Sequence, residues 1–295
     1  MGDIDLHIHS LYSDDGEFSV EELMDQAEKA KLKVAAIADH DSVNASLRMR
    51  ELARTTTVRW IDAIEISCRL HDLDLHLLGY FIDPTDPRFA SIEARMRETE
   101  EKLTERRLGL LEGHFKKPFP LEELRTFADG KILTGEKICE WLLNDEENKK
   151  HPELRSYFQN GSRSDNPQVN FYWDYLSQGK VAYLPADLPS LKECIKLIHD
   201  VGGVAILAHP GKNVKEDHFV LDEMIPLGLD GLEVFSSYHS ETQIAYYAAY
   251  AKKKNLMMTC GSDYHGKTKP RIKMGMTHCP LDAQEIVSTL ERGRK

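Results

Sequence analysis

Two histidines near the N-terminus have a spacing that suits metal binding. In the stretch Asp5-Leu6-His7-Ile8-His9 the two imidazoles are separated by a single residue. Successive side chains of an extended strand alternate between its two faces, so His7 and His9 would point the same way. Two converging imidazoles can hold one metal ion, although a half-buried strand with two solvated histidines would have the same short sequence. The rest of the chain has to decide between these interpretations.

Other histidines and acidic residues recur at comparable places along the chain. Those at or near the C-terminal ends of predicted strands are His40, Glu65, His76, His209, Asp263 and His265. In β/α barrels this rim is where catalytic residues gather, because the loops that follow the strands are free to vary. A single histidine at a strand end is commonly a structural, hydrogen-bonded residue. A whole group of them with acidic neighbours on separate strands predicts a metal site.

The chemistry of the donors narrows the choice of ion. The candidate ligands are imidazoles and carboxylates without thiolates, a set that suits Zn²⁺, Mn²⁺ or Fe²⁺. Since they outnumber what one ion can use, we expect two or three divalent ions. Clustered divalent ions make hydroxide available near neutral pH and bind the oxygens of a phosphoryl group during its displacement.

Short apolar strands alternate with helical patterns in two parts of the chain. The predicted strands are residues 4–9, 34–38, 58–66, 73–81, 203–208, 231–235 and 256–260. Capping boxes formed by Ser19 with Glu22 and by Ser190 with Glu193 mark the starts of two helices. This alternation favours βα units and a parallel sheet, and seven strands indicate an α/β barrel whose eighth unit is irregular or missing.

The pattern changes between residues 85 and 180. Residues 88–115 predict a long, charged, amphipathic helix, and 121–128 and 135–143 predict shorter helices. We therefore expect a mainly helical cap at residues 85–180, inserted into a barrel domain made of residues 1–84 and 181–295.

Composition excludes several classes of protein. The formal net charge of −11 argues against a binder of duplex nucleic acid, which would need a basic stripe. No apolar run approaches the roughly 18 residues of a membrane span. Asp3 and Asp5 lie where a signal peptide would have basic and apolar segments, and the five cysteines form no CxxC pair. We expect a cytoplasmic protein with reduced thiols and no membrane partner.

Taken in order, the motifs resemble those of the polymerase and histidinol phosphatase (PHP) family. They are His7-Ile8-His9-Ser10 with Ser13-Asp14, Asp39-His40-Asp41, Glu65, His76, Ala208-His209-Pro210 and Asp263-Tyr264-His265. The resemblance covers the chain apart from the variable cap. It implies a distorted (β/α)7 barrel and a metallophosphoesterase with a trinuclear centre.

Positions carried over from the family imply three sets of metal ligands. They are His7, His9, Glu65 and Asp263 for one ion, Glu65 as a bridge to a second ion on His76 and His209, and Asp14, His40 and His265 for the third.

The acidic ligand of the third ion is ambiguous. The family usually has Ser-Asp-Gly where this chain has Ser13-Asp14-Asp15-Gly16. Spacing from Ser10 favours Asp14 and adjacency to Gly16 favours Asp15, and we expect Asp14 to be the ligand.

A phosphate needs positive or donor groups beyond the metal ions. Lys212 follows a ligand strand and could reach a phosphate. His239 resembles a family position that faces the substrate, and we expect either His239 or a metal-bound water to be the proton donor. Arg163, Lys137 and Lys180 in the cap are further candidates for binding a second phosphate.

Two branches of the family suggest different small phosphorylated substrates. The branch acting on nucleoside 3′,5′-bisphosphates and short oligoribonucleotides tends to carry Gly-Arg-Pro-His in the cap, whereas the matching stretch here is Thr134-Gly135-Glu136-Lys137. Residues 13–19 and 169–174 resemble instead a branch that hydrolyses 5-phosphoribose 1,2-cyclic phosphate, opening the diester and then removing the monoester phosphate. We favour this second substrate. Hydrolysis of a non-phosphate bond and a non-catalytic PHP module are the alternatives of another class.

Overall fold

The strands of the protein form one sheet that curls into a nearly closed barrel. A computed structural model describes residues 2–52 and 56–295. Its strands, in their order across the sheet, are β1 (Ile4–Ile8), β2 (Val34–Ile37), β3 (Arg59–Leu70), β4 (Leu73–Tyr80), β5 (Val204–Leu207), β6 (Gly231–Ser236) and β7 (Met257–Gly261). The sheet closes where the His9 N–H bonds to the Tyr264 carbonyl and the Asp263 N–H to the His7 carbonyl, at 2.9 and 2.8 Å. The predicted α/β barrel is confirmed.

One strand runs against its neighbours. β4 is antiparallel to both β3 and β5, while the other neighbouring pairs are parallel. The expectation of a parallel sheet was therefore wrong at β4. Only His71 and Asp72 separate β3 from β4, and His71 has a φ of +53°. A connection of two residues can join only antiparallel strands, because a parallel crossover needs a dozen residues or more.

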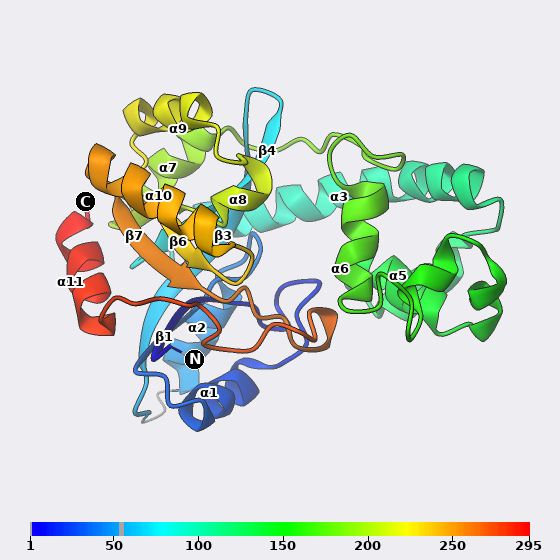
Figure 1. The fold of residues 1–295 in the computed structure, drawn as a ribbon, viewed down its shortest axis with the longest axis horizontal. Helices are drawn as coiled ribbons and strands as arrows, with labels where there is room; N and C mark the ends of the chain where they lie inside the picture. Colours follow the sequence, from blue (N-terminus) through cyan, green and yellow to red (C-terminus); the bar gives the residue numbers. More distant parts are fainter. Residues whose placement is uncertain (1, 53–55) are drawn as a thin grey trace.

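Helices cover the outside of the barrel (Figure 1). They are α1 (Val20–Lys29), α2 (Asn44–Leu52), α7 (Leu191–Asp200), α8 (Pro210–Asn213), α9 (His218–Met224), α10 (Glu241–Lys254) and α11 (Ala283–Gly293), with the 3₁₀ turns η4 (Ile225–Leu227) and η5 (Gly266–Thr268). The capping boxes at Ser19 and Ser190 open α1 and α7. No helix within residues 2–52 and 56–295 is long and apolar enough to cross a membrane.

A second lobe lies between β4 and β5 in the sequence. Its elements are α3 (Pro87–Phe115), α4 (Leu121–Ala128), α5 (Gly135–Leu143), η1 (Glu146–Lys150), η2 (Leu154–Tyr157), α6 (Pro167–Phe171) and a π-helical turn η3 (Tyr172–Leu176). Figure 1 shows α3 leading away from the barrel to this lobe. The lobe has its own apolar core around Leu111, Phe115 and Phe171. Because this core is separate from that of the barrel, we propose that residues 85–180 act as a cap.

Candidate metal centre

The carboxylate of Glu65, on β3, lies in the middle of a cluster of histidines. The side chain is completely buried. The imidazole nitrogens around it are His7 Nε2, His9 Nε2 and His40 Nδ1, at 3.2, 3.3 and 3.0 Å from Oε2, and His76 Nδ1 and His209 Nε2, at 3.0 and 3.1 Å from Oε1. These histidines come from β1, β4 and the loops after β2 and β5. The barrel thus brings distant parts of the sequence to one carboxylate.

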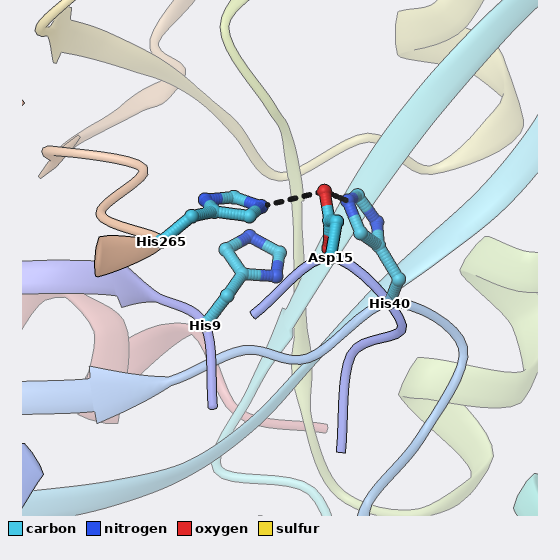
Figure 2. A group of neighbouring side chains, drawn as sticks. All are labelled: His9, Asp15, His40 and His265. Atoms are coloured by element: carbon cyan, nitrogen blue, oxygen red, sulfur yellow. Dashed lines mark ion pairs between the residues drawn. The ribbon is translucent and has the colours of Figure 1, made fainter. Parts of the chain in front are cut away.

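Three overlapping groups of side chains could each hold a metal ion. They are His7, His9, Glu65 and Asp263; His9, Asp15, His40 and His265 (Figure 2); and His40, Glu65 and His76. Within each group the ligand atoms lie within 4.8 Å of one another. His9, His40 and Glu65 each belong to two groups, so ions bound here would share ligands.

Buried polar atoms at the centre fit the presence of cations. Among the described residues, the atoms that are buried without a hydrogen-bond partner include His7 Nε2, His9 Nε2, Glu65 Oε2, Asp263 Oδ1 and His265 Nε2. Unpartnered polar atoms are rare in native interiors because each costs free energy. Several of them in one cluster fit a bound cation, and nitrogen and carboxylate donors suit Zn²⁺, Mn²⁺ or Fe²⁺.

The structure favours Asp15 over the Asp14 that we expected from spacing. Oδ2 of Asp15 lies 3.1 Å from His265 Nε2 and 4.0 Å from His40 Nε2, and Figure 2 shows it between the two rings. Asp14 turns away, and its Oδ1 accepts a hydrogen bond from the Ile132 N–H in the cap. The turn between Ser13 and Gly16 decides which acid faces inward, and sequence spacing does not record its direction.

Hydrogen bonds and strained backbone hold the ligands in place. Ser13 Oγ lies 2.9 Å from both His9 Nδ1 and Asp39 Oδ1, so it fixes the ring of His9 and leaves Nε2 facing the centre. His209 and Asp263 have φ values of +25° and +58°. Such backbone conformations cost free energy in residues other than glycine and gather at functional sites.

In the absence of ions, His7 and His9 supply positive charge at the centre. Burial lowers the pKa of His9, but the carboxylates of Asp263 and Glu65 outweigh it and raise that pKa to about 9. Burial likewise opposes protonation of His7, while Glu65, Glu233 and Asp263 raise the pKa of His7 well above its ordinary value. The metal-free centre therefore carries protons at neutral pH.

A cavity of about 300 Å³ opens onto the cluster between the barrel and the cap. The barrel side of its wall includes Lys212, Tyr238 and Lys269, and the cap side includes Glu136, Tyr172 and Trp173. The wall thus combines ammonium groups near the metal ligands with aromatic rings from the cap.

Lys212 and Lys269 place two ammonium groups beside the cluster. Lys212 Nζ lies 4.4 Å from the centre of the Tyr238 ring and 5.2 Å from that of Trp173, and no ion pair is found for it in the described part of the chain. Lys269 is buried and pairs with Asp263 Oδ2 at 2.5 Å, where the Tyr238 hydroxyl also donates a hydrogen bond. Sequence reasoning missed Lys269, whose only signal was its place four residues after His265.

Glu136 is a second cavity residue that sequence reasoning did not select. It lies in the first turn of α5 and lines the cavity. Burial and the nearby carboxylate of Asp15 raise the pKa of Glu136 to about 7. Near neutral pH this carboxyl group can therefore either donate or accept a hydrogen bond.

The cap cations that we considered for phosphate binding lie elsewhere. Arg163 pairs with Asp174, with Nε 2.7 Å from Oδ2, and Lys180 is exposed. Lys137 pairs with Glu140 at 2.9 Å and lines only a much smaller hollow. None of the three lines the large cavity.

His239 also lies outside the cavity. Its Nε2 accepts a hydrogen bond from the Gly211 N–H at 3.0 Å, and its Nδ1 lies 2.8 Å from the Val234 carbonyl. Since both nitrogens are used by the backbone and the ring does not line the cavity, the structure argues against the proton-donor role expected for it. Its position instead supports the loop that carries His209 and Lys212.

Known proteins resemble the chain over nearly its whole length. The family model of the PHP domain matches residues 5–200. The chain is 28% identical to a 3′,5′-nucleoside bisphosphate phosphatase of Chromobacterium violaceum, over 94% of this chain and 92% of the relative. It is 26% identical to a phosphoribosyl 1,2-cyclic phosphate 1,2-diphosphodiesterase of Eggerthella lenta, over 89% of this chain and 94% of the relative.

A solved structure shares the fold. A protein of Bifidobacterium adolescentis assigned as a metal-dependent phosphoesterase superimposes with a TM-score of 0.75 and 26% identity. The match covers 97% of this chain and 94% of the other. The barrel and its helical lobe are therefore a shared architecture.

The two neighbouring aspartates provide a test of the third ligand set. We expect Asp15→Asn to lower the metal content of the purified protein by about one ion per chain, because it weakens the ligand between His40 and His265. Asp14→Asn should leave the metal content unchanged. Both are measured by elemental analysis of protein dialysed against metal-free buffer. The opposite pattern would restore Asp14 as the ligand.

Metal binding should release protons. Because His7 and His9 are protonated in the metal-free protein at pH 7 and a ligating imidazole nitrogen must be free, binding should displace roughly one to two protons. The affinity should then rise with pH from neutral pH to at least about pH 9, where metal-free His9 loses its proton. Calorimetric titration with Zn²⁺ in two buffers of different ionisation enthalpy measures this release, and identical heats in both buffers would contradict the expectation.

Proposed function

The chain belongs to the PHP domain family and is a metal-dependent phosphoric ester hydrolase, and we propose that its substrate is 5-phosphoribose 1,2-cyclic phosphate. Water would first open the cyclic diester to a monoester, and a second water would then release inorganic phosphate. The proposed ligands are His7, His9, Asp15, His40, Glu65, His76, His209, Asp263 and His265, which would hold two or three ions.

One observation carries the phosphoester chemistry. Two largely buried ammonium groups, those of Lys212 and Lys269, line a cavity that opens on the histidine and carboxylate cluster. Bound divalent ions supply an activated water near neutral pH and offset the negative charge of phosphoryl oxygens. Charge-assisted hydrogen bonds from ammonium to phosphate oxygens are stronger than neutral ones, and a largely enclosed cavity strengthens them further.

The protein's own residues have separate tasks in this proposal. Lys212 binds and orients the phosphoryl group. The faces of the Tyr238 and Trp173 rings hold the Lys212 side chain in place. Lys269 and the Tyr238 hydroxyl fix Asp263 Oδ2, so that Oδ1 faces the cluster. Tyr172 and Trp173 on the cap exclude water from the cavity.

The position of Glu136 favours a ribose phosphate over a nucleotide as the substrate. It occupies the cap stretch where the nucleotide-acting branch resembled by the sequence carries an arginine. A carboxyl group in the cavity wall suits sugar hydroxyls, and it cannot replace an arginine as a phosphate ligand. The carboxyl group in place of the arginine supports the cyclic ribose phosphate.

A nucleoside 3′,5′-bisphosphate or a short oligoribonucleotide is the second candidate. It is favoured by the similarity to the Chromobacterium violaceum phosphatase. Tyr172 and Trp173 line the cavity and present aromatic rings on which a base can stack.

Direct comparison of the two substrates tests the proposal. We expect turnover of 5-phosphoribose 1,2-cyclic phosphate with Mn²⁺, Fe²⁺ or Zn²⁺, with inorganic phosphate appearing after the ring-opened monoester. Adenosine 3′,5′-bisphosphate should react at least about tenfold more slowly in kcat/KM, a difference of about 1.4 kcal/mol. Faster turnover of the bisphosphate would select the second candidate, and absence of turnover on either by metal-loaded protein would refute both.

Replacing Lys212 should weaken the handling of phosphate. Lys212→Met keeps the aliphatic stem between the rings but removes the charge, and we expect kcat/KM to fall by about ten- to a hundredfold, the value of one hydrogen bond to a charged group. Lys192→Met on the exposed side of α7 is the matched control. Steady-state kinetics of both variants on the substrate of the wild-type enzyme measure the effect, and equal kinetics of the two would remove Lys212 from the site.

A further inference from the structure

Glu233 joins two of the candidate metal ligands from behind. It lies on β6, is fully buried, and uses both carboxylate oxygens. Oε1 lies 2.9 Å from His7 Nδ1, and Oε2 accepts a hydrogen bond of 2.9 Å from the His209 N–H. The first contact reaches β1, on the far side of β7, and the second reaches the end of β5. Nothing in the motifs of the sequence selects this residue.

Both contacts of Glu233 require an acceptor. A backbone N–H can only donate, so Oε2 must accept from His209, and Oε1 can accept from a proton on His7 Nδ1. When metal binding displaces the second proton of the ring, the Nδ1–H that remains leaves the lone pair on Nε2, and this is the atom that lies 3.2 Å from Glu65 Oε2 in the cluster. A ring nitrogen can bind a metal ion only through such a lone pair.

The backbone of β7 leaves room for the contact between His7 and Glu233. A Cβ at Gly261, on β7, would lie 2.1 Å from His7 Cβ and 2.3 Å from Glu233 Oε1. Both distances are far below van der Waals contact, so any side chain at Gly261 would displace the pair. The missing side chain of Gly261 on β7 therefore leaves the space that the His7–Glu233 contact occupies.

From these contacts we infer that Glu233 is a positioning residue that selects the Nδ1-protonated form of His7 and anchors the loop of His209, so that both rings are ready to bind metal. The inference rests on the metal centre of the proposed function. To that centre the inference adds Glu233, which determines which ring nitrogen of the ligand His7 carries a proton. Carboxylate partners of this kind change metal affinity by about 10- to 100-fold.

Glutamine at position 233 cannot satisfy both neighbours while His7 carries its proton on Nδ1, and it fits only the other form of His7, in which the proton blocks Nε2. Its carboxamide has the size of the carboxylate but offers one acceptor and one donor. If its oxygen accepts from the His209 N–H, its NH₂ group faces the Nδ1–H of His7, and two donors oppose each other. If the amide is turned round, the same conflict arises at His209. Glu233→Gln therefore removes one contact without leaving a cavity.

The experiment measures affinity and protonation separately. Zn²⁺ affinity is obtained for the full chain by competition with a chromophoric chelator, for wild type, Glu233→Gln and Glu223→Gln. The last is the matched control, because Glu223 lies 2.7 Å from His71 Nε2 on the exposed surface. Two-bond ¹H–¹⁵N spectra of ¹⁵N-histidine-labelled protein report which nitrogen of His7 is protonated, with His7→Asn used to assign its signals.

We expect Glu233→Gln to weaken Zn²⁺ binding by about 10- to 100-fold with an unchanged circular dichroism spectrum, and Glu223→Gln to bind as wild type does. In zinc-loaded wild type the Nδ1 of His7 should be protonated and hydrogen-bonded, and this signal should shift or vanish in Glu233→Gln.

Two outcomes overturn the inference. Equal Zn²⁺ affinity of wild type and Glu233→Gln would do so while leaving the proposed function intact. If Glu233→Gln does not fold, the wild-type spectrum decides alone, because His7 bound through Nδ1 would exclude the proposed role. Absence of Zn²⁺ binding by wild type would instead overturn the metal centre, and with it the proposed function.

Discussion

A single buried carboxylate, that of Glu65, constrains how the strands and side chains of the barrel are arranged around it. An ionised carboxylate without water costs several kcal/mol unless positive charge and hydrogen bonds surround it. Here five imidazoles from four different parts of the chain provide that surrounding. Some of them, such as His7 and His9, can do so as protonated histidines, and the group could also do so by holding metal ions together with the carboxylate. The strands are thus arranged so that positive charge surrounds and balances the one negative charge of Glu65.

Much of this cluster could be predicted because its histidines and acids lie beside strands, and strands have a simple period. His7 on β1 and His9 directly after it face one way, and the residues after β2, β5 and β7 gather at one rim whatever the details of the turns. Features that depend on turn geometry could not be predicted in this way. The choice between Asp14 and Asp15, the reversed direction of β4 and the burial of His239 against Gly211 are all of this kind.

Residues that contact a candidate ligand, rather than being one themselves, were even harder to predict from the sequence. Glu233 is an ordinary acid in an apolar strand, and Lys269 is one of several lysines in a polar loop. Their importance appears only when β6, β7 and the loop after β7 are placed against β1. The cap presents the same difficulty. Its helices could be predicted from the sequence, but the side chains that it turns toward the cavity could not. The residues that could be predicted therefore lie in the barrel, whereas contacts made by the cap, such as that of Trp173 with Lys212, are seen only in the structure.

Closure of the sheet between β1 and β7 has a consequence for how the enzyme is made. During synthesis on the ribosome, His7 and His9 emerge first, and Asp263 and His265 emerge only when the last strand does. Until β7 docks on β1, the two candidate groups that contain Asp263 or His265 are incomplete, whereas His40, Glu65 and His76 all precede β7 in the chain. Completion of the cluster therefore depends on the strand that closes the barrel.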